Sequence, residues 1–168
     1  MSHQATDDQA AHELLEKANA EREKLLNFFI RLGVSSYESE DLVQETLLRV
    51  WRYRDQYQET AKLTTFLFLL ARQVRIDALR RRIRRERREE TWFAERPQAT
   101  PAPSYLVRED VLQALASLPE AMREVVELGL FQDLPYAEVA EILAIPVGTV
   151  KSRMFNALKK LKEYFDDN

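Results

Sequence analysis

Apolar residues recur at intervals of three and four along most of this 168-residue chain, and this helical period constrains the fold more than any other feature. The stretch from Ala10 to Leu32 shows the pattern first, and Gly33 is well placed to end the helix that it predicts. The whole sequence contains only three glycines, too few for the tight turns of an all-β sandwich. The sequence therefore predicts an all-α protein.

Six further helices are expected. A turn at residues 35–39 offers several N-cap side chains to the first of them, whose apolar face holds Leu42, Val43, Thr46, Leu47, Val50 and Trp51. Residues 53–62 lack a period and predict a loop. A long helix follows from about Leu63 to about Glu90, apolar in its first half and rich in arginine in its second. The remaining helices are expected near 105–117, 120–131, 135–143 and 147–165.

Proline divides the chain into two domains. Pro97, Pro101 and Pro103 fall within seven positions, and proline cannot continue a helix and favours extended chain. We place a linker at residues 94–104, between an N-terminal helical domain at 1–93 and a small C-terminal domain at 105–168.

The composition excludes many kinds of site. Cysteine is absent, which excludes disulfides, thiolate nucleophiles and Cys-ligated zinc. The two histidines, His3 and His12, do not have the spacing of a paired-His metal site, and no glycine-rich phosphate-binding loop occurs. We therefore expect no catalytic residue, no metal and no cofactor. The longest apolar run, Phe66 to Ala71, is far shorter than the roughly 20 residues that cross a bilayer, so no membrane insertion is expected.

Positive charge is concentrated in one segment. The net charge of the chain is −3, yet residues 72–88 carry nine arginines against Asp77 and Glu86, a local net charge of +7. Such a block indicates a localised contact with a polyanion, and a solvated Arg/Glu helix is the alternative. The preceding loop holds Tyr57, Gln58, Thr60 and Lys62, whose aromatic and amide groups suit unpaired bases.

Residues 135–158 show the pattern of a helix-turn-helix. Two amphipathic segments flank Ala144-Ile145-Pro146. A left-handed Ala144, where glycine is usual, would cost roughly 1–2 kcal/mol; a slightly different turn is the alternative. The second segment carries polar and cationic side chains near its start, as a helix in the major groove needs: Thr149, Lys151, Ser152, Arg153 and Asn156, with Lys159 near flanking phosphates. A helical bundle with a solvated Lys/Arg face is the alternative.

Three stretches together resemble a known family. They are EDLVQETLLRVWRYRDQY at 40–57, TTFLFLLARQVRIDALRRRIRR at 64–85 and LPEAMREVVELGLFQDLPYAEVAEILAIPVGTVKSRMFNALKKL at 118–161. They resemble a bacterial RNA polymerase sigma factor of the extracytoplasmic-function (ECF) group of the sigma-70 family. The resemblance implies domains of the sigma region 2 and region 4 types, and a cytoplasmic promoter-recognition subunit that is not an enzyme.

The resemblance also implies partners and site residues. Core RNA polymerase would be contacted at its β′ clamp helices and β flap, with Asp41, Gln44, Glu45 and Arg49 on the clamp helices. Promoter DNA would be contacted at the −10 element by Tyr57, Gln58, Thr60, Lys62, Arg72, Arg75, Arg80, Arg81, Arg84 and Arg85. The −35 element would meet Thr149, Lys151, Ser152, Arg153, Phe155, Asn156 and Lys159. An anti-sigma factor is a further candidate partner.

Two other functions would each explain part of the sequence. A stand-alone helix-turn-helix regulator would explain the C-terminal domain but leave the DLVQET helix without a role. A helical protein–protein adaptor would explain the amphipathic helices but not the concentration of arginine.

Overall fold

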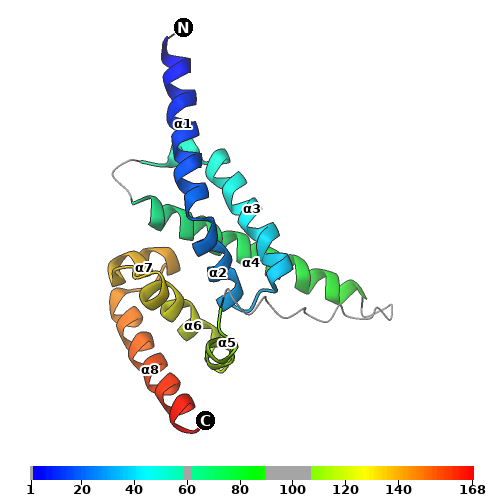
Figure 1. Ribbon diagram of the computed structural model, residues 1–168, viewed down its shortest axis with the longest axis vertical. Coiled ribbons are helices and arrows are strands. Elements are labelled where there is room, and N and C mark those ends of the chain that lie inside the picture. Colours follow the sequence, from blue (N-terminus) through cyan, green and yellow to red (C-terminus); the bar gives the residue numbers. More distant parts are fainter. Residues whose placement is uncertain (1, 59–61, 90–106) are drawn as a thin grey trace. The chain divides into compact units, whose positions relative to one another are not determined.

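The computed structural model describes residues 2–58, 62–89 and 107–168, and these residues form helices and no β-strand (Figure 1). The helices are α1 (Ser2–Ala20), α2 (Arg22–Arg31), α3 (Ser36–Arg52), the short 3₁₀ helix η1 (Arg54–Gln56), α4 (Leu63–Glu89), α5 (Glu109–Ala116), α6 (Glu120–Val126), the π-helical turn η2 (Glu127–Phe131), α7 (Tyr136–Leu143) and α8 (Val147–Asp166). The prediction of an all-α protein is confirmed. The predicted linker at 94–104 lies outside the described residues.

The first predicted helix is two helices in the structure. The N–H of Glu21 donates to the carbonyl of Ala18, 3.1 Å away, and this tighter turn ends α1 before α2 begins. The apolar pattern weakens at the same place, because polar residues dominate between Ala18 and Leu25. Ser35 caps α3 as expected: its Oγ accepts from the N–H of Glu38 and donates to the Glu38 carboxylate, both at 3.3 Å.

The chain divides into two compact units. The first contains α1, α2 as far as Leu25, α3 from Glu40 onward, and α4; the second contains Leu26–Ser39 and α5 to α8. Residues 26–39, which the sequence places in the N-terminal domain, are thus grouped with the second unit. In the first unit the core is built from α1, α3 and α4 together with Leu25 of α2, and the following residues are buried: Leu14, Ala18, Leu25, Val43, Leu47, Val50, Leu67, Phe68, Ala71 and Val74.

The second unit contains the predicted helix-turn-helix. Helix α7 packs on α8, and α8 also packs on α5 and α6. Ala144 takes the left-handed conformation that is usual at this turn, with φ 53° and ψ 46°, and the N–H of Ile145 donates to the carbonyl of Ala140 at 3.1 Å. The α7–α8 turn therefore closes with a non-glycine residue in a strained conformation.

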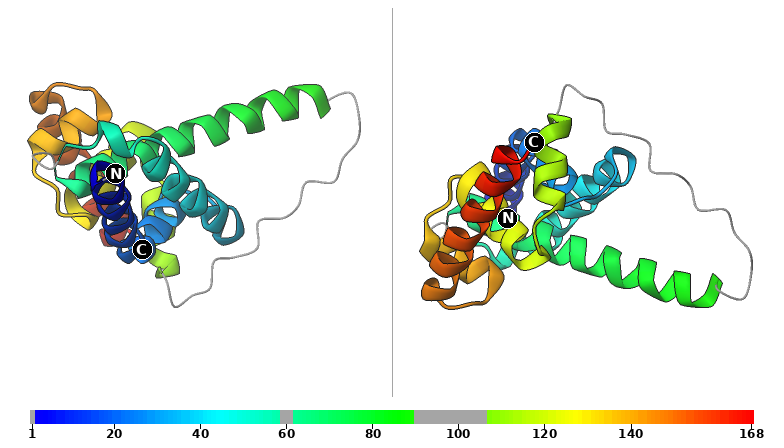
Figure 2. Two further views of the ribbon diagram at one scale, coloured as in Figure 1. Left: turned by 90° about the horizontal axis from the view of Figure 1, so that it is seen from above. Right: turned by 90° about the horizontal axis from the view of Figure 1, so that it is seen from below.

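Two features of the helices bear on function. Figures 1 and 2 show α4 as a single uninterrupted helix, so its apolar and arginine-rich halves share one axis. None of the helices in the described residues is both long and apolar enough to cross a membrane.

Candidate nucleic-acid interface

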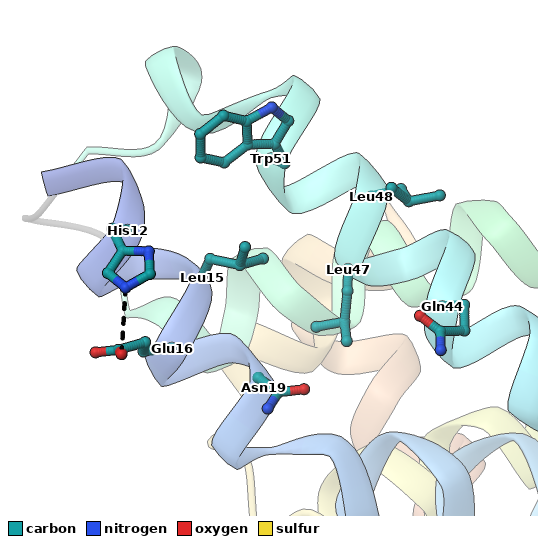
Figure 3. Close-up of a pocket in the computed structure, with 8 residues that line it drawn as sticks. All are labelled: His12, Leu15, Glu16, Asn19, Gln44, Leu47, Leu48 and Trp51. Carbon is teal, nitrogen blue, oxygen red and sulfur yellow. Dashed lines mark ion pairs between the residues drawn. The ribbon is translucent and has the colours of Figure 1, made fainter. Parts of the chain in front are cut away.

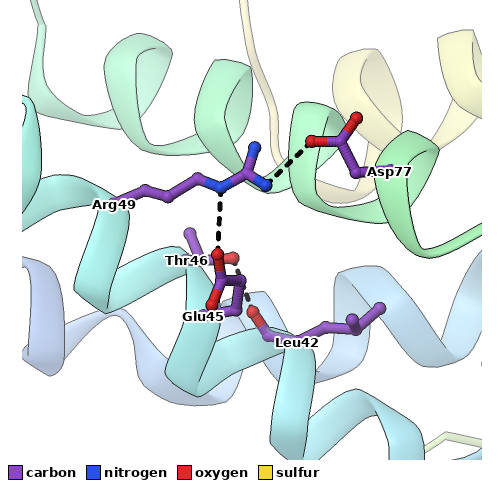
Figure 4. Close-up of polar contacts among 5 residues, drawn as sticks. All are labelled: Leu42, Glu45, Thr46, Arg49 and Asp77. Carbon is purple, nitrogen blue, oxygen red and sulfur yellow. Dashed lines mark hydrogen bonds and ion pairs between the residues drawn. The ribbon is translucent and has the colours of Figure 1, made fainter. Parts of the chain in front are cut away.

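The four predicted polymerase-binding residues of α3 differ in exposure. Asp41 and Gln44 are exposed and free to meet a partner. Arg49 instead faces inward: its Nε lies 3.2 Å from Oε1 of Glu45, and its Nη2 lies 2.8 Å from Oδ2 of Asp77 on α4 (Figure 4). Burial opposes the charge of Arg49, but the hydrogen bonds and negative charges of Asp77 and Glu45 outweigh it and raise its pKa. Arg49 therefore joins two helices of the first unit.

A groove of about 370 Å³ lies between α1 and α3, beside Gln44 (Figure 3). Leu48 and Trp51 line one wall and remain 57% and 40% exposed. His12, on the α1 wall, has its Nε2 3.4 Å from Oε1 of Glu16. The apolar period predicts that Trp51 lies on the buried face of its helix, and nothing in the sequence indicates the groove. The apolar period identifies the face of a helix, but not where a neighbouring helix stops covering it.

The loop after α3 is held by aromatic contacts. The ring of Tyr57 is half-buried and lies 5.3 Å from that of Phe66, centroid to centroid, at 43°. The guanidinium of Arg54 lies 4.4 Å from the centroid of the Trp51 ring, and its Nη1 donates to the Trp51 carbonyl at 2.8 Å. Gln58 and Lys62 are exposed. Thr60, the remaining candidate of this loop, lies outside the described residues.

The arginines of α4 differ in exposure along the helix. Arg75 is buried, with 8% of its surface exposed, and Arg72 is half-buried; both have interaction partners. Arg80, Arg81, Arg84 and Arg85 are exposed and form no ion pair with any described residue, whereas Arg82 pairs with Glu86 at 3.2 Å. We call residues 80–88 the basic arm. Arg75 lies within the folded body and not on this arm, so the predicted set of −10 contacts is not a single surface.

Helix α8 exposes the residues predicted to meet the −35 element. Val150, Met154 and Ala157 are buried on one face. The opposite face exposes Lys151, Ser152, Phe155, Asn156 and Lys159, while Thr149 and Arg153 are half-buried. Phe155 is 71% exposed. Val147 and Leu158, at the sides of the buried face, are 38% and 44% exposed.

The second unit contains a buried ion pair that the sequence pattern does not predict. Glu127 of η2 is fully buried, and its carboxylate accepts from Nε of Arg31 at 2.7 Å, Nη2 of Arg31 at 3.0 Å and Nε2 of Gln132 at 2.9 Å. The Arg31 guanidinium also lies 4.4 Å from the centroid of the Phe131 ring. Burial raises the pKa of Glu127, and Arg31 and Gln132 oppose that effect. The only signal in the sequence is an acid within the apolar run VVELGLF.

No group of three or more His, Cys, Asp or Glu side chains that could hold a metal ion occurs within 2–58, 62–89 and 107–168. One basic arm can neutralise phosphates, and one helix presents hydrogen-bonding groups to a groove.

Comparisons with known proteins agree with this chemistry. Residues 18–85 match the family model of Sigma-70 region 2, and residues 108–161 match that of Sigma-70, region 4. The ECF RNA polymerase sigma factor RpoE of Cereibacter sphaeroides is 30% identical over 145 residues, which cover 84% of this chain and 80% of that protein. The ECF RNA polymerase sigma factor SigL of Mycobacterium tuberculosis is 34% identical over 142 residues, covering 82% of this chain and 80% of the relative.

A solved structure shares the fold. The sigma factor RpoE in complex with the anti-sigma factor NepR, from Bartonella quintana, matches with a TM-score of 0.71 and 26% identity over 96% of this chain and 97% of that one. Both family models, the relatives and this structure agree with the resemblance seen in the sequence. The chain therefore belongs to the extracytoplasmic-function group of the sigma-70 family, and is a sigma factor that binds core RNA polymerase and promoter DNA and directs promoter recognition and transcription initiation.

Proposed function

We propose that this sigma factor binds core polymerase, the −10 region and the −35 element through three separate surfaces. Asp41 and Gln44 of α3, with the neighbouring groove, dock onto the β′ clamp helices of core polymerase, and the second unit meets the β flap. The basic arm holds the backbone of the −10 region during strand opening, with Tyr57, Gln58 and Thr60 around an unpaired base. The exposed face of α8 reads the −35 element. The chain acts in the cytoplasm and carries no catalytic activity.

The observation that carries this proposal is the exposure of the basic arm. An acid three or four residues away on the helix can pair with an arginine, yet Arg80, Arg81, Arg84 and Arg85 are exposed and form no ion pair within the described residues. A cluster of unmatched cations on one helix is suited to releasing counterions from a nucleic acid. A protein–protein adaptor would not explain the basic arm. A stand-alone helix-turn-helix regulator would not explain the exposed polar face of α3.

In vitro transcription tests the proposal. Purified bacterial core polymerase is mixed with fragmented genomic DNA of the source organism, with and without the chain, and the 5′ ends of the transcripts are sequenced. We expect new start sites that share −10 and −35 elements. Equal transcript sets with and without the chain would refute the proposed function.

A matched pair of variants tests the docking surface. Asp41→Arg with Gln44→Arg changes two exposed side chains of α3 and spares the Glu45–Arg49–Asp77 contacts, so it should abolish binding to core polymerase at an unchanged helical CD signal. Asp7→Arg with Asp8→Arg reverses two exposed charges of α1 and should leave binding intact. Wild-type affinity of the α3 variant would show that core polymerase docks elsewhere.

We also propose an anti-sigma factor as a partner. The Bartonella quintana sigma factor that shares this fold was solved with one. A protein of this kind should compete with core polymerase for the chain. Simultaneous binding of both would contradict this role.

A further inference from the structure

Asp77 lies where α4 leaves the body of the first unit. Val74 is buried, three residues before it, and every residue from Leu79 to Arg88 is exposed. Arg80 and Arg81 follow Asp77 by three and four residues, the spacing at which an acid and a base on one helix pair. In the absence of another partner, the Asp77 carboxylate would pair with one of these two arginines and neutralise its charge.

The structure shows another partner. Oδ2 of Asp77 lies 2.8 Å from Nη2 of Arg49, which reaches across from α3 and is also bound by Glu45 (Figure 4). The Arg49 side chain is 13% exposed, whereas that of Asp77 is 42% exposed. Arg80 and Arg81 form no ion pair with any residue in the described part of the chain.

We propose that Arg49 is a positioning residue that holds the Asp77 carboxylate against α3 and so keeps Arg80 and Arg81 free for DNA phosphates. This inference rests on the proposed function, because the phosphates are those of promoter DNA. It also replaces the role first expected of Arg49: the residue acts on the basic arm through Asp77 and does not touch the polymerase.

The consequence is electrostatic and can be measured. Without Arg49, the carboxylate turns to Arg80 or Arg81, and the arm presents one phosphate-neutralising charge fewer. Each phosphate neutralised on duplex DNA contributes about 0.9 to the slope of log K against log [salt], and about 0.7 on a single strand. Removing Asp77 together with Arg49 should restore the slope, because no carboxylate is left to occupy the arm.

The experiment uses holoenzyme and a promoter identified in the transcription assay, with affinities measured from about 50 to 300 mM KCl. We expect Arg49→Gln to flatten the slope by about 0.7–0.9. Arg49→Gln with Asp77→Asn should regain the wild-type slope, and Arg49→Lys, which keeps one cation near Asp77, should resemble the wild type. Affinity for core polymerase, measured without DNA, should be the same for all four proteins.

Three results would overturn the inference. The first is a loss of core affinity in Arg49→Gln that Asp77→Asn does not rescue, which would make Arg49 a docking residue. The second is an unchanged slope in Arg49→Gln. The third concerns Asp77→Asn alone, which should leave the slope unchanged. A slope steeper by about 0.7–0.9 in this variant would mean that Asp77 already neutralises the basic arm in the wild type. A wild-type chain that supports no transcription would refute the proposed function itself.

Discussion

The stability of the folded second unit should depend strongly on the ion pair between Arg31 and the buried Glu127 carboxylate. Arg31→Met keeps much of the aliphatic side chain and removes both hydrogen bonds to Glu127, at 2.7 and 3.0 Å. Removing one partner of a buried ion pair typically costs about 3–5 kcal/mol, because the other charge is left without compensation. The hydrogen bond from Gln132 remains and protonation of Glu127 limits the cost, so we expect about 3 kcal/mol at pH 8.

The cost should depend on pH in a defined direction. Burial already raises the pKa of Glu127 in the folded protein, so its contribution to stability is greatest below its unfolded pKa and is lost as the pH rises through the folded pKa. Arg31 lowers the pKa of Glu127 in the folded protein. Its removal should therefore raise that pKa further. The destabilisation should therefore be smaller at pH 5 than at pH 8.

Hydrogen exchange in α6 and η2 measures the change locally. A loss of about 3 kcal/mol corresponds to roughly 100-fold less protection of amides that exchange through opening of this region. Arg22→Met is the matched control, because it removes an exposed pair with Glu40 whose side chains are 38% and 53% exposed, and should change stability by less than about 1 kcal/mol. Equal, small effects of both variants, or a cost that grows as the pH falls, would refute the reasoning.

Three further outcomes are expected. Ala144→Gly should stabilise the second unit by about 0.5–1 kcal/mol in urea unfolding, because relief of the left-handed strain at φ 53° exceeds the entropy that glycine adds to the unfolded chain; a loss of stability would contradict this. Arg80→Gln with Arg84→Gln should flatten the salt dependence of promoter binding by about 1.4–1.8 on every promoter, and an unchanged slope would exclude phosphate contact. Asn156→Ala should relax the preference at one −35 base pair by roughly 1–3 kcal/mol in a panel of single-base variants, whereas an equal loss on all of them would indicate a backbone contact.

Local chemistry explains what could be predicted along the chain. Ser35 caps α3, Ala144 is left-handed, and α4 is one long helix, because each depends on residues within a few positions of one another. The exposed arginines of the arm and the polar face of α8 follow from the same periodicity. The sigma-factor family was recognisable for a related reason: the stretches that resemble it are continuous in the sequence.

Contacts between distant segments could not be read in this way. Nothing near Arg49 in the sequence indicates that Asp77, 28 residues later, binds it, and nothing near Arg31 indicates Glu127, 96 residues later. The exposure of Trp51 and the burial of Arg75 likewise depend on which helix covers them. The all-α class, the family and the positions of the charged segments follow from the sequence alone, whereas the packing of the helices fixes which of those charges are available to a partner. The physical reason is that helical period and capping act over a few residues, while the pairing or burial of a charge depends on side chains brought together from distant parts of the chain.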